Sequence, residues 1–177
     1  MSNPSLPVPI AGRLLVATPE LADPNFAHTV VLLLAVRPEG ALGIVLNRPS
    51  DRRVDDVLPR WADRVAAPAV VFFGGPVGLD SVVGLSAQGA VDLDDAMFGD
   101  VPGDDDGTSD IRLFAGSAGW GAEQLEAEIA DGSWWVFDVE AGDVTTSDPE
   151  TLWQRVLRRQ PGLTAWFALA TADPSFN

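Results

Sequence analysis

Residues 29–47 read TVVLLLAVRPEGALGIVLN, two apolar runs joined by the turn Pro38-Glu39-Gly40. The first run extends from Phe26 to Val36 and is rich in β-branched residues and Leu, and the second covers residues 41–47. Two such runs on either side of a short turn predict a β-hairpin. Nearly every position in both runs is apolar, a pattern typical of strands that are covered on both faces. We therefore place this hairpin in the middle of a covered sheet.

Further strands and helices are predicted on both sides of the hairpin. The predicted strands cover residues 12–18, 69–73, 81–86, 111–115 and 133–139. The predicted helices start at residues 49–51, with a break or kink at Pro59, cover residues 119–130, and run from residues 147–150 to Pro161-Gly162. Strands outnumber helices, and the two do not alternate regularly. This arrangement favours an α+β fold with a mixed sheet over a doubly wound parallel sheet.

The length of 177 residues suits one domain. Residues 1–11 are Pro-rich and are expected to form a flexible N-terminal tail before a single domain over residues 12–177, in which residues 87–110 form a long acidic loop. The longest apolar run, residues 30–36, is too short to cross a bilayer, and residues 1–9 lack the features of a secretory signal. The sequence therefore predicts a cytoplasmic protein with no membrane partner.

Composition excludes several kinds of chemistry. The chain has no Cys and no Lys, and His28 is its single histidine. Thiolate catalysis, Cys-ligated zinc, P-loop chemistry and Schiff-base chemistry are therefore excluded. The net charge of -15 repels a phosphate backbone, so a nucleic-acid partner is not expected. No metal or cofactor is predicted either, because Asp104-Asp105-Asp106-Gly107 lacks the Glu that a calcium loop needs six residues after its Gly; that position is Leu113.

Three weaker patterns leave alternatives open. Ser117, between a predicted strand and a predicted helix, lies in the sequence AGSAG, which is close to a nucleophile elbow, although His28 precedes it rather than following it. His28 follows Asp23 in a loop, where it serves either as a base or as a structural residue. The five arginines of residues 48–64 form either a local basic face for DNA or a solvated face paired with Asp; they are Arg48, Arg52, Arg53, Arg60 and Arg64.

One predicted helix carries two more polar candidates. Gln124 and Glu128 are neighbours at positions i and i+4 of the helix predicted over residues 119–130. They either bind a ligand or cap a strand edge. The same helix is expected to begin at Gly119-Trp120-Gly121, where free backbone N–H groups attract an anion.

Four blocks of sequence are specific as a set. They are PELADPNF (residues 19–26) leading to TVVLL (29–33), GALGIVLNRP (40–49), GGPV (74–77), and AGWG (118–121) followed by QLE and EI (124–126 and 128–129). In this order the sequence resembles the YqgE/AlgH family of bacterial proteins from about residue 12 to residue 167. The resemblance implies a cytoplasmic α+β domain whose strongly twisted, partly barrel-like mixed sheet is surrounded by a few helices.

The resemblance implies no chemistry, because the family has no agreed activity. Some members carry a transcriptional-regulator label tied to alginate production, but no DNA-binding element supports that label in this sequence. Glu123 stands where such proteins usually have Gly, and Ser117 where Tyr is common, which puts a shared catalytic site in doubt. A shared functional surface would involve the matching positions Asn25, Phe26, Asn47, Arg48, Gly74, Gly75, Pro76, Gly119, Trp120 and Gln124.

The leading hypothesis is a non-enzymatic binding or regulatory domain with no catalytic residue. Its groove is predicted between residues 74–77, 47–49 and 119–124, because ligand sites often lie at Gly- or Pro-bearing ends of core elements. The ligand is a protein segment or a small anion, and substituting Trp120 or Arg48 is expected to abolish binding with the fold intact. The alternatives are a small hydrolase or transferase that uses Ser117 or His28, and a DNA-binding regulator that uses the arginines of residues 48–64.

Overall fold

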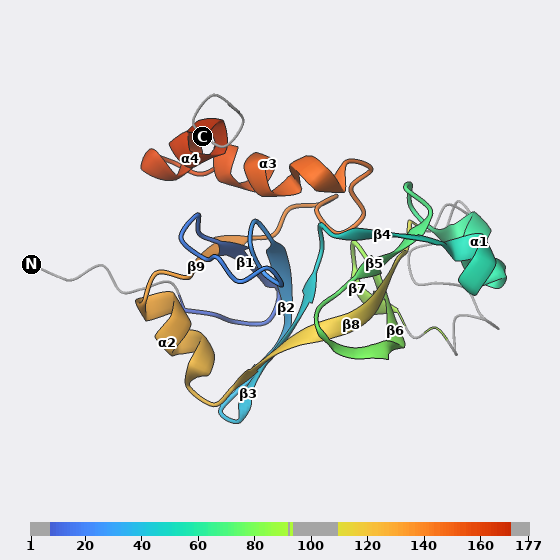
Figure 1. Cartoon of the computed structure of the whole chain (residues 1–177), viewed down its shortest axis with the longest axis horizontal. Coiled ribbons are helices and arrows are strands. Elements are labelled where there is room, and N and C mark those ends of the chain that lie inside the picture. Colours follow the sequence, from blue (N-terminus) through green and yellow to red (C-terminus); the bar gives the residue numbers. More distant parts are fainter. Residues whose placement is uncertain (1–7, 92, 94–109, 171–177) are drawn as a thin grey trace, which may run out of the picture.

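The computed structural model of the chain describes residues 8–91, 93 and 110–170. Its centre is a nine-stranded mixed sheet with the order β4-β5-β8-β3-β2-β1-β9, to which β6 and β7 are attached through β8 (Figure 1). The strands are β1 Arg13–Ala17, β2 Val30–Arg37, β3 Gly40–Val45, β4 Pro49–Arg53, β5 Val70–Phe73, β6 Val77–Ser86, β7 Gly89–Val91, β8 Arg112–Gly121 and β9 Trp134–Asp138. The α+β class with a mixed sheet is therefore confirmed. The sheet is not closed, so the barrel-like character that the resemblance implies extends only to its shape.

Short helices surround the sheet. They are α1 Val54–Val57, the 3-10 helix η1 Pro59–Arg64, α2 Gln124–Ala130, the 3-10 helix η3 Pro149–Thr151, α3 Leu152–Arg158 and α4 Leu163–Ala170. In Figure 1, α3 and α4 lie over one face of the sheet, α2 lies on the opposite side, and α1 lies at the far end. The break predicted at Pro59 separates α1 from η1, and Pro161-Gly162 separates α3 from α4, for which the sequence gave no expectation.

The predicted hairpin is confirmed as β2 and β3, which pair antiparallel. Successive residues of these strands point to opposite faces of the sheet. Val30 and Leu32 pack in the core under α3 and α4, whereas Val31 and Leu33 pack in the core beside α2. Both faces of the hairpin are therefore buried, as the continuous apolar runs predict. A third, smaller core joins α1 and η1 to β5 and β8 around Trp61.

Two predicted helix starts are wrong. Residues 49–51 begin strand β4, and residues 119–121 end strand β8, so the helix predicted over residues 119–130 begins only at Gln124. Small residues at 115–119 suggested a turn. In the structure they let neighbouring backbones approach β8 closely: a Cβ on Gly74 would meet the carbonyl oxygen of Gly116, and a Cβ on Gly40 would meet that of Trp120.

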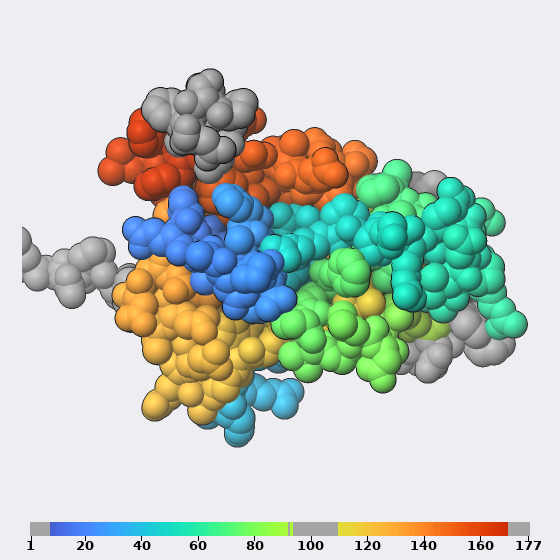
Figure 2. Space-filling view, viewed as in Figure 1, coloured from blue at the N-terminus to red at the C-terminus, as the bar shows by residue number. Residues whose placement is uncertain are grey.

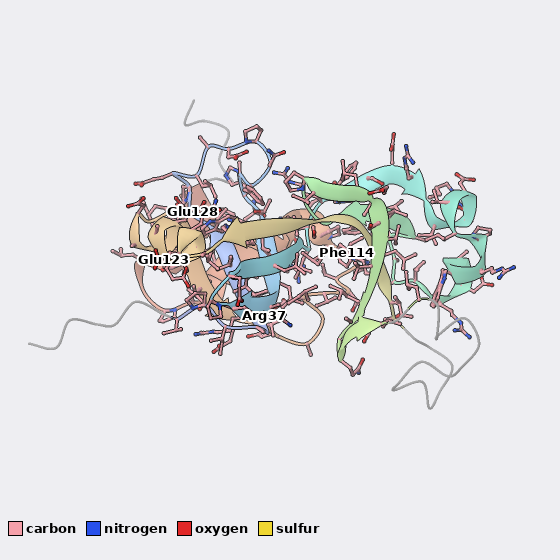
Figure 3. The ribbon with its side chains drawn as sticks, turned by 90° about the horizontal axis from the view of Figure 1, so that it is seen from below. Arg37, Phe114, Glu123 and Glu128 are labelled. Carbon is pink, nitrogen blue, oxygen red and sulfur yellow. The ribbon has the colours of Figure 1, made fainter. Side chains whose placement is uncertain are left out.

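Strand β8 connects the two halves of the sheet. It pairs parallel with β5 at Phe114 and Ala115, and antiparallel with β3 from Ala118 to Gly121. Along its other edge it pairs with β6. Figure 3 shows β8 running from Phe114 to α2, where Glu123 and Glu128 are labelled. Strand β7 lies inside the stretch predicted as an acidic loop, most of which is outside the described residues, as is most of the predicted N-terminal tail.

Candidate functional site

A pocket of about 250 Å³ opens where β3 and β5 end and β6 begins. Most of its wall is apolar, and two polar side chains complete it. It is lined by Asn25, Val45, Arg48, Phe73, Gly75, Pro76 and Leu79, and we name it the Arg48 pocket. In Figure 2 the blue, cyan and green segments that contribute these residues lie side by side on one face.

Two adjacent glycines hold the pocket against β8. The Gly74 N–H donates to the carbonyl oxygen of Ala115 at 2.8 Å, and the Gly74 carbonyl accepts from the N–H of Val45 at 2.8 Å. A Cβ on Gly75, whose φ is +150°, would meet the backbone of Ser117. Both glycines are therefore required by backbone packing, which gives them a structural role beside any role in binding.

Asn47 fixes the loop of residues 23–28 beside the pocket. Its Nδ2 donates to the carbonyl oxygen of His28 at 2.9 Å, and its Oδ1 accepts from the N–H of Val30 at 2.9 Å. Both ends of the amide are thus used within the protein. Asn47 positions the loop and does not line the pocket.

Arg48 fixes the same loop and also lines the pocket. Its terminal nitrogens donate to the carbonyl oxygens of Pro24 at 2.8 Å and Ala27 at 3.0 Å. These bonds use two of about five guanidinium N–H donors. Within the described part of the chain, no carboxylate forms an ion pair with it. Burial lowers the pKa of Arg48 and nearby Asp23 opposes that shift, so a half-buried cation stands at the pocket of an acidic protein.

Arg112 is a useful contrast because it is wholly internal. Its side chain is only 1% exposed, it donates to the carbonyl oxygens of Thr146 at 2.6 Å and Ala67 at 2.7 Å, and its guanidinium carbon lies 4.2 Å from the centre of the Phe72 ring. Burial lowers the pKa of Arg112 to about 10. Arg112 has no surface left for a ligand, whereas Arg48 does.

A second group of predicted site residues forms an aromatic cluster of Phe26, Trp120, Trp134, Gln124 and Glu128. The ring of Phe26 lies 6.1 Å from that of Trp120 and 5.6 Å from that of Trp134, centre to centre. One carboxylate oxygen of Glu128 accepts from both indole N–H groups at 2.9 Å, and its other oxygen accepts from Gln124 Nε2 at 2.9 Å. Every polar side chain of this cluster therefore has an internal partner.

Comparison with known proteins follows from this fold. A family model described as AlgH-like matches residues 14–165. The chain belongs to the AlgH-like family. A UPF0301 protein of Streptomyces avermitilis is 46% identical over 184 residues, which cover 95% of each chain. The resemblance to the YqgE/AlgH family is thus confirmed.

Two solved structures share the AlgH-like fold. The crystal structure of protein DIP2367 from Corynebacterium diphtheriae is 32% identical, with a TM-score of 0.77 over 92% of this chain and 93% of that one. The solution structure of the AlgH protein from Pseudomonas aeruginosa is 30% identical, with a TM-score of 0.60 over 98% of this chain and 97% of that one. The names of these proteins state no reaction and no ligand, so function has to be argued from the geometry.

The predicted groove of this AlgH-like chain divides between the two places described above. Four of its residues line the Arg48 pocket: Asn25, Arg48, Gly75 and Pro76. Asn47 and Gly74 support the pocket from behind. Of the remaining predicted residues, Phe26, Trp120 and Gln124 belong to the aromatic cluster, and Gly119 is exposed on β8. Residues 47–49 and 74–77 therefore converge, whereas residues 119–124 do not line the same pocket.

Sequence reasoning missed three apolar residues of the pocket wall, namely Val45, Phe73 and Leu79. Val45 and Phe73 end strands that we expected to be wholly internal. Phe73 is 48% exposed and Leu79 is 55% exposed. The nearest sequence signal is their position on either side of the Gly-Gly-Pro turn, but the direction of their side chains depends on how that turn packs on β8.

The catalytic alternatives find little support in the AlgH-like fold. Ser117 lies inside β8, paired with Val77, and not at a strand-to-helix turn, so the predicted nucleophile elbow is wrong. The ring of His28 packs 4.8 Å from that of Trp153, centre to centre. In the described residues the His28 ring has no hydrogen bond or ion pair with a carboxylate, which agrees with its structural alternative.

The arginine-rich segment has internal partners of its own. Arg53 pairs with Asp55 at 2.6 Å, and the guanidinium of Arg64 lies 5.8 Å from the centre of the Trp61 ring. Arg48 instead contacts residues 24–27 at the pocket. The local basic face predicted over residues 48–64 is therefore interrupted by acidic and aromatic partners.

Two searches of the described residues gave negative results. No helix among residues 8–91, 93 and 110–170 is long and apolar enough to cross a membrane. The same residues contain no group of three or more His, Asp or Glu side chains placed to hold a metal ion. Residues 104–106, considered above for calcium, lie outside this part of the chain.

Proposed function

We propose that this AlgH-like protein is a non-enzymatic binding domain and that the Arg48 pocket is its ligand site. The ligand joins an anionic group to an apolar group. The observation that supports this is a guanidinium without a carboxylate partner in the described structure, at an otherwise apolar pocket of a chain with net charge -15. An unpaired cation beside apolar walls matches an anion that carries a hydrocarbon part.

The size of the pocket limits the affinity of a small ligand. A volume of about 250 Å³ suits a group the size of one apolar side chain. Burying such a group contributes about 1.5–3 kcal/mol, and a hydrogen bond to a charged group contributes about 1.5–3 kcal/mol. Their sum corresponds to a Kd from about 1 mM down to tens of micromolar. Small ligands must therefore be tested at millimolar concentrations.

Thermal unfolding in the presence of chosen anions tests the proposal. We expect N-acetyl-leucine and phenyl phosphate to raise the Tm, and the neutral N-acetyl-leucinamide to leave it unchanged. A ligand at ten times its Kd adds about 1.4 kcal/mol of stability, which raises the Tm of a domain this size by about 3–6 °C.

Matched variants locate the effect. Arg48→Gln and Leu79→Glu are expected to abolish the shift, and Arg60→Gln, which removes an exposed arginine outside the pocket, is expected to retain it. Leu79 is more than half exposed, so its substitution leaves the fold intact. Equal shifts in the Leu79→Glu and parent proteins would place the ligand elsewhere. No shift with any apolar anion at 20-fold the expected Kd would remove the proposal.

A further inference from the structure

The first strand residues beyond the pocket leave one edge of the sheet without a partner. Strand β6 pairs with β8 at Val77 and again from Val82 to Leu85. On its opposite edge, β7 covers only residues 84–86. From residue 77 to residue 81, β6 therefore has no strand neighbour on that edge within the described structure, and all five residues are exposed. An edge of this kind accepts an added extended strand.

Apolar side chains continue from the pocket onto this strand. Val77 is 58% exposed, Leu79 is 55% exposed, and Phe73, at the end of β5, is 48% exposed. Leu79 and Phe73 line the pocket, and Val77 follows its Gly75-Pro76 wall directly. Scattered exposed apolar residues are ordinary, but three gathered at a pocket and along a free strand edge indicate an interaction surface.

The polar groups of the pocket define one end of the ligand. Arg48 has guanidinium donors left over after it binds the two loop carbonyls. The side-chain amide of Asn25, also in the lining, has no hydrogen-bond partner among the described residues. Both groups stand within the same small volume as the apolar wall. A carboxylate and an apolar group must therefore come from a single small unit.

The last residue of a polypeptide is such a unit, because it carries a main-chain carboxylate and its own side chain on one Cα. On the basis of the proposed function, we infer that the ligand is the C-terminal segment of a protein that ends in an apolar residue. The terminal carboxylate contacts Arg48 and Asn25, the last side chain fills the apolar part of the pocket, and the preceding residues pair as an added strand with residues 77–81 of β6. Main-chain pairing then supplies contacts that a single small acid lacks.

Labelled peptides test this inference by fluorescence anisotropy. The probe is a pool of hexapeptides with an N-terminal dye, mixed residues at the first five positions, and a C-terminal Leu with a free carboxylate. The matched pool is identical except that its C-terminus is amidated. We expect the free-acid pool to bind at least tenfold more tightly than the amidated pool, and at least tenfold more tightly than N-acetyl-leucine measured by competition.

Variants and backbone-blocked peptides separate the parts of the inference. Arg48→Gln and Leu79→Glu are each expected to weaken binding of the free-acid pool at least tenfold, and Arg60→Gln is expected to leave it unchanged. Methylating the backbone nitrogens of alternate peptide residues removes strand hydrogen bonds, so one of the two possible alternations is expected to weaken binding by a similar factor. Circular dichroism of each variant verifies that its fold is retained.

The outcomes distinguish this inference from the proposed function. Equal affinity of N-acetyl-leucine and the peptide pool would overturn the added strand and leave a pocket for small apolar anions. Equal affinity of the free-acid and amidated pools would overturn the carboxylate contact. No binding of the free-acid pool at 1 mM would overturn the inference as a whole, and the proposed function would then depend on the thermal-shift experiment.

Discussion

The Arg48 pocket and the aromatic cluster start from neighbouring residues of one loop and differ in what their polar groups contact. Asn25 lines the pocket, and the next residue, Phe26, packs on Trp120 and Trp134. In the cluster, Glu128 and Gln124 have internal partners for their side chains. In the pocket, the Asn25 amide and part of the Arg48 guanidinium have none among the described residues. Hydrogen bonding and exposure, rather than residue type, therefore separate a candidate site from a structural cluster.

The largest effect is expected from Trp120→Ala in the cluster. The side chain is 6% exposed, and its removal leaves a cavity and an unpaired carboxylate oxygen on Glu128. We expect the free energy of unfolding to fall by about 3–5 kcal/mol. Denaturant titration measures the change, and Leu79→Ala, at an exposed residue of the pocket, is the matched control with a change within about 0.5 kcal/mol. Similar losses in the two variants would erase the distinction between the regions. Trp120 is thus unsuited to the binding test that the sequence suggested.

A smaller but substantial loss is expected from Gly75→Ala in the pocket wall. The φ of +150° and the close backbone of Ser117 leave no room for a Cβ. We expect a loss of about 2–4 kcal/mol, from backbone strain and overpacking together. Gly78→Ala is the control, because Gly78 has a φ of +64° but no atom within 4 Å of a built Cβ. If both variants lose the same amount, strain alone accounts for the loss and contact with β8 is unimportant.

Arg48→Gln is expected to loosen the loop that the two regions share. The substitution removes the hydrogen bonds to the carbonyl oxygens of Pro24 and Ala27. We expect a loss of about 1–2 kcal/mol because the site is partly exposed. Hydrogen exchange of residues 23–28 should accelerate, while the indole N–H of Trp134 in the cluster stays protected. Unchanged exchange in the loop would show that Asn47 alone holds it.

The smallest effect, and the only gain, is expected from Glu123→Gly before α2. Glu123 has a φ of +61°, in the region that favours glycine. The glycine that such proteins usually have at this position relieves the strain, so we expect stability to rise by about 0.5–1 kcal/mol. Glu126→Gly, inside α2, is the control and should lower stability by about 0.5–1 kcal/mol. A loss in the Glu123 variant would mean that the Glu side chain helps to hold α2 beside the cluster.

The sequence predicted those parts of the fold that depend on local pattern. Two continuous apolar runs around a turn identified the central hairpin, because burial on both faces leaves no alternation to misread. The same reasoning failed at residues 115–121, where small residues permit close approach to Gly74 and Gly40 instead of forming a turn. Strand register determines which of these two explanations applies, and no local pattern encodes it.

The candidate site was predicted to a similar extent. The Gly-Gly-Pro turn and the Asn-Arg-Pro strand end converge, because both follow neighbouring elements of the sheet. The exposed faces of Phe73 and Leu79 could not be read from the sequence, since an apolar residue in a strand is most often internal. Likewise, the indole N–H of Trp120 finds Glu128 only because β8 continues to α2.

Nuclear magnetic resonance of the ¹⁵N-labelled protein, titrated with the free-acid peptide pool, tests the central claim most directly. The account predicts that chemical-shift changes concentrate on the backbone amides of Asn25, Gly75 and Leu79 and on the side-chain Nε–H of Arg48. It also predicts that the indole N–H signals of Trp120 and Trp134 stay where they are. Changes at the two indoles without changes at Gly75 and Leu79 would contradict it and move the ligand site to the aromatic cluster.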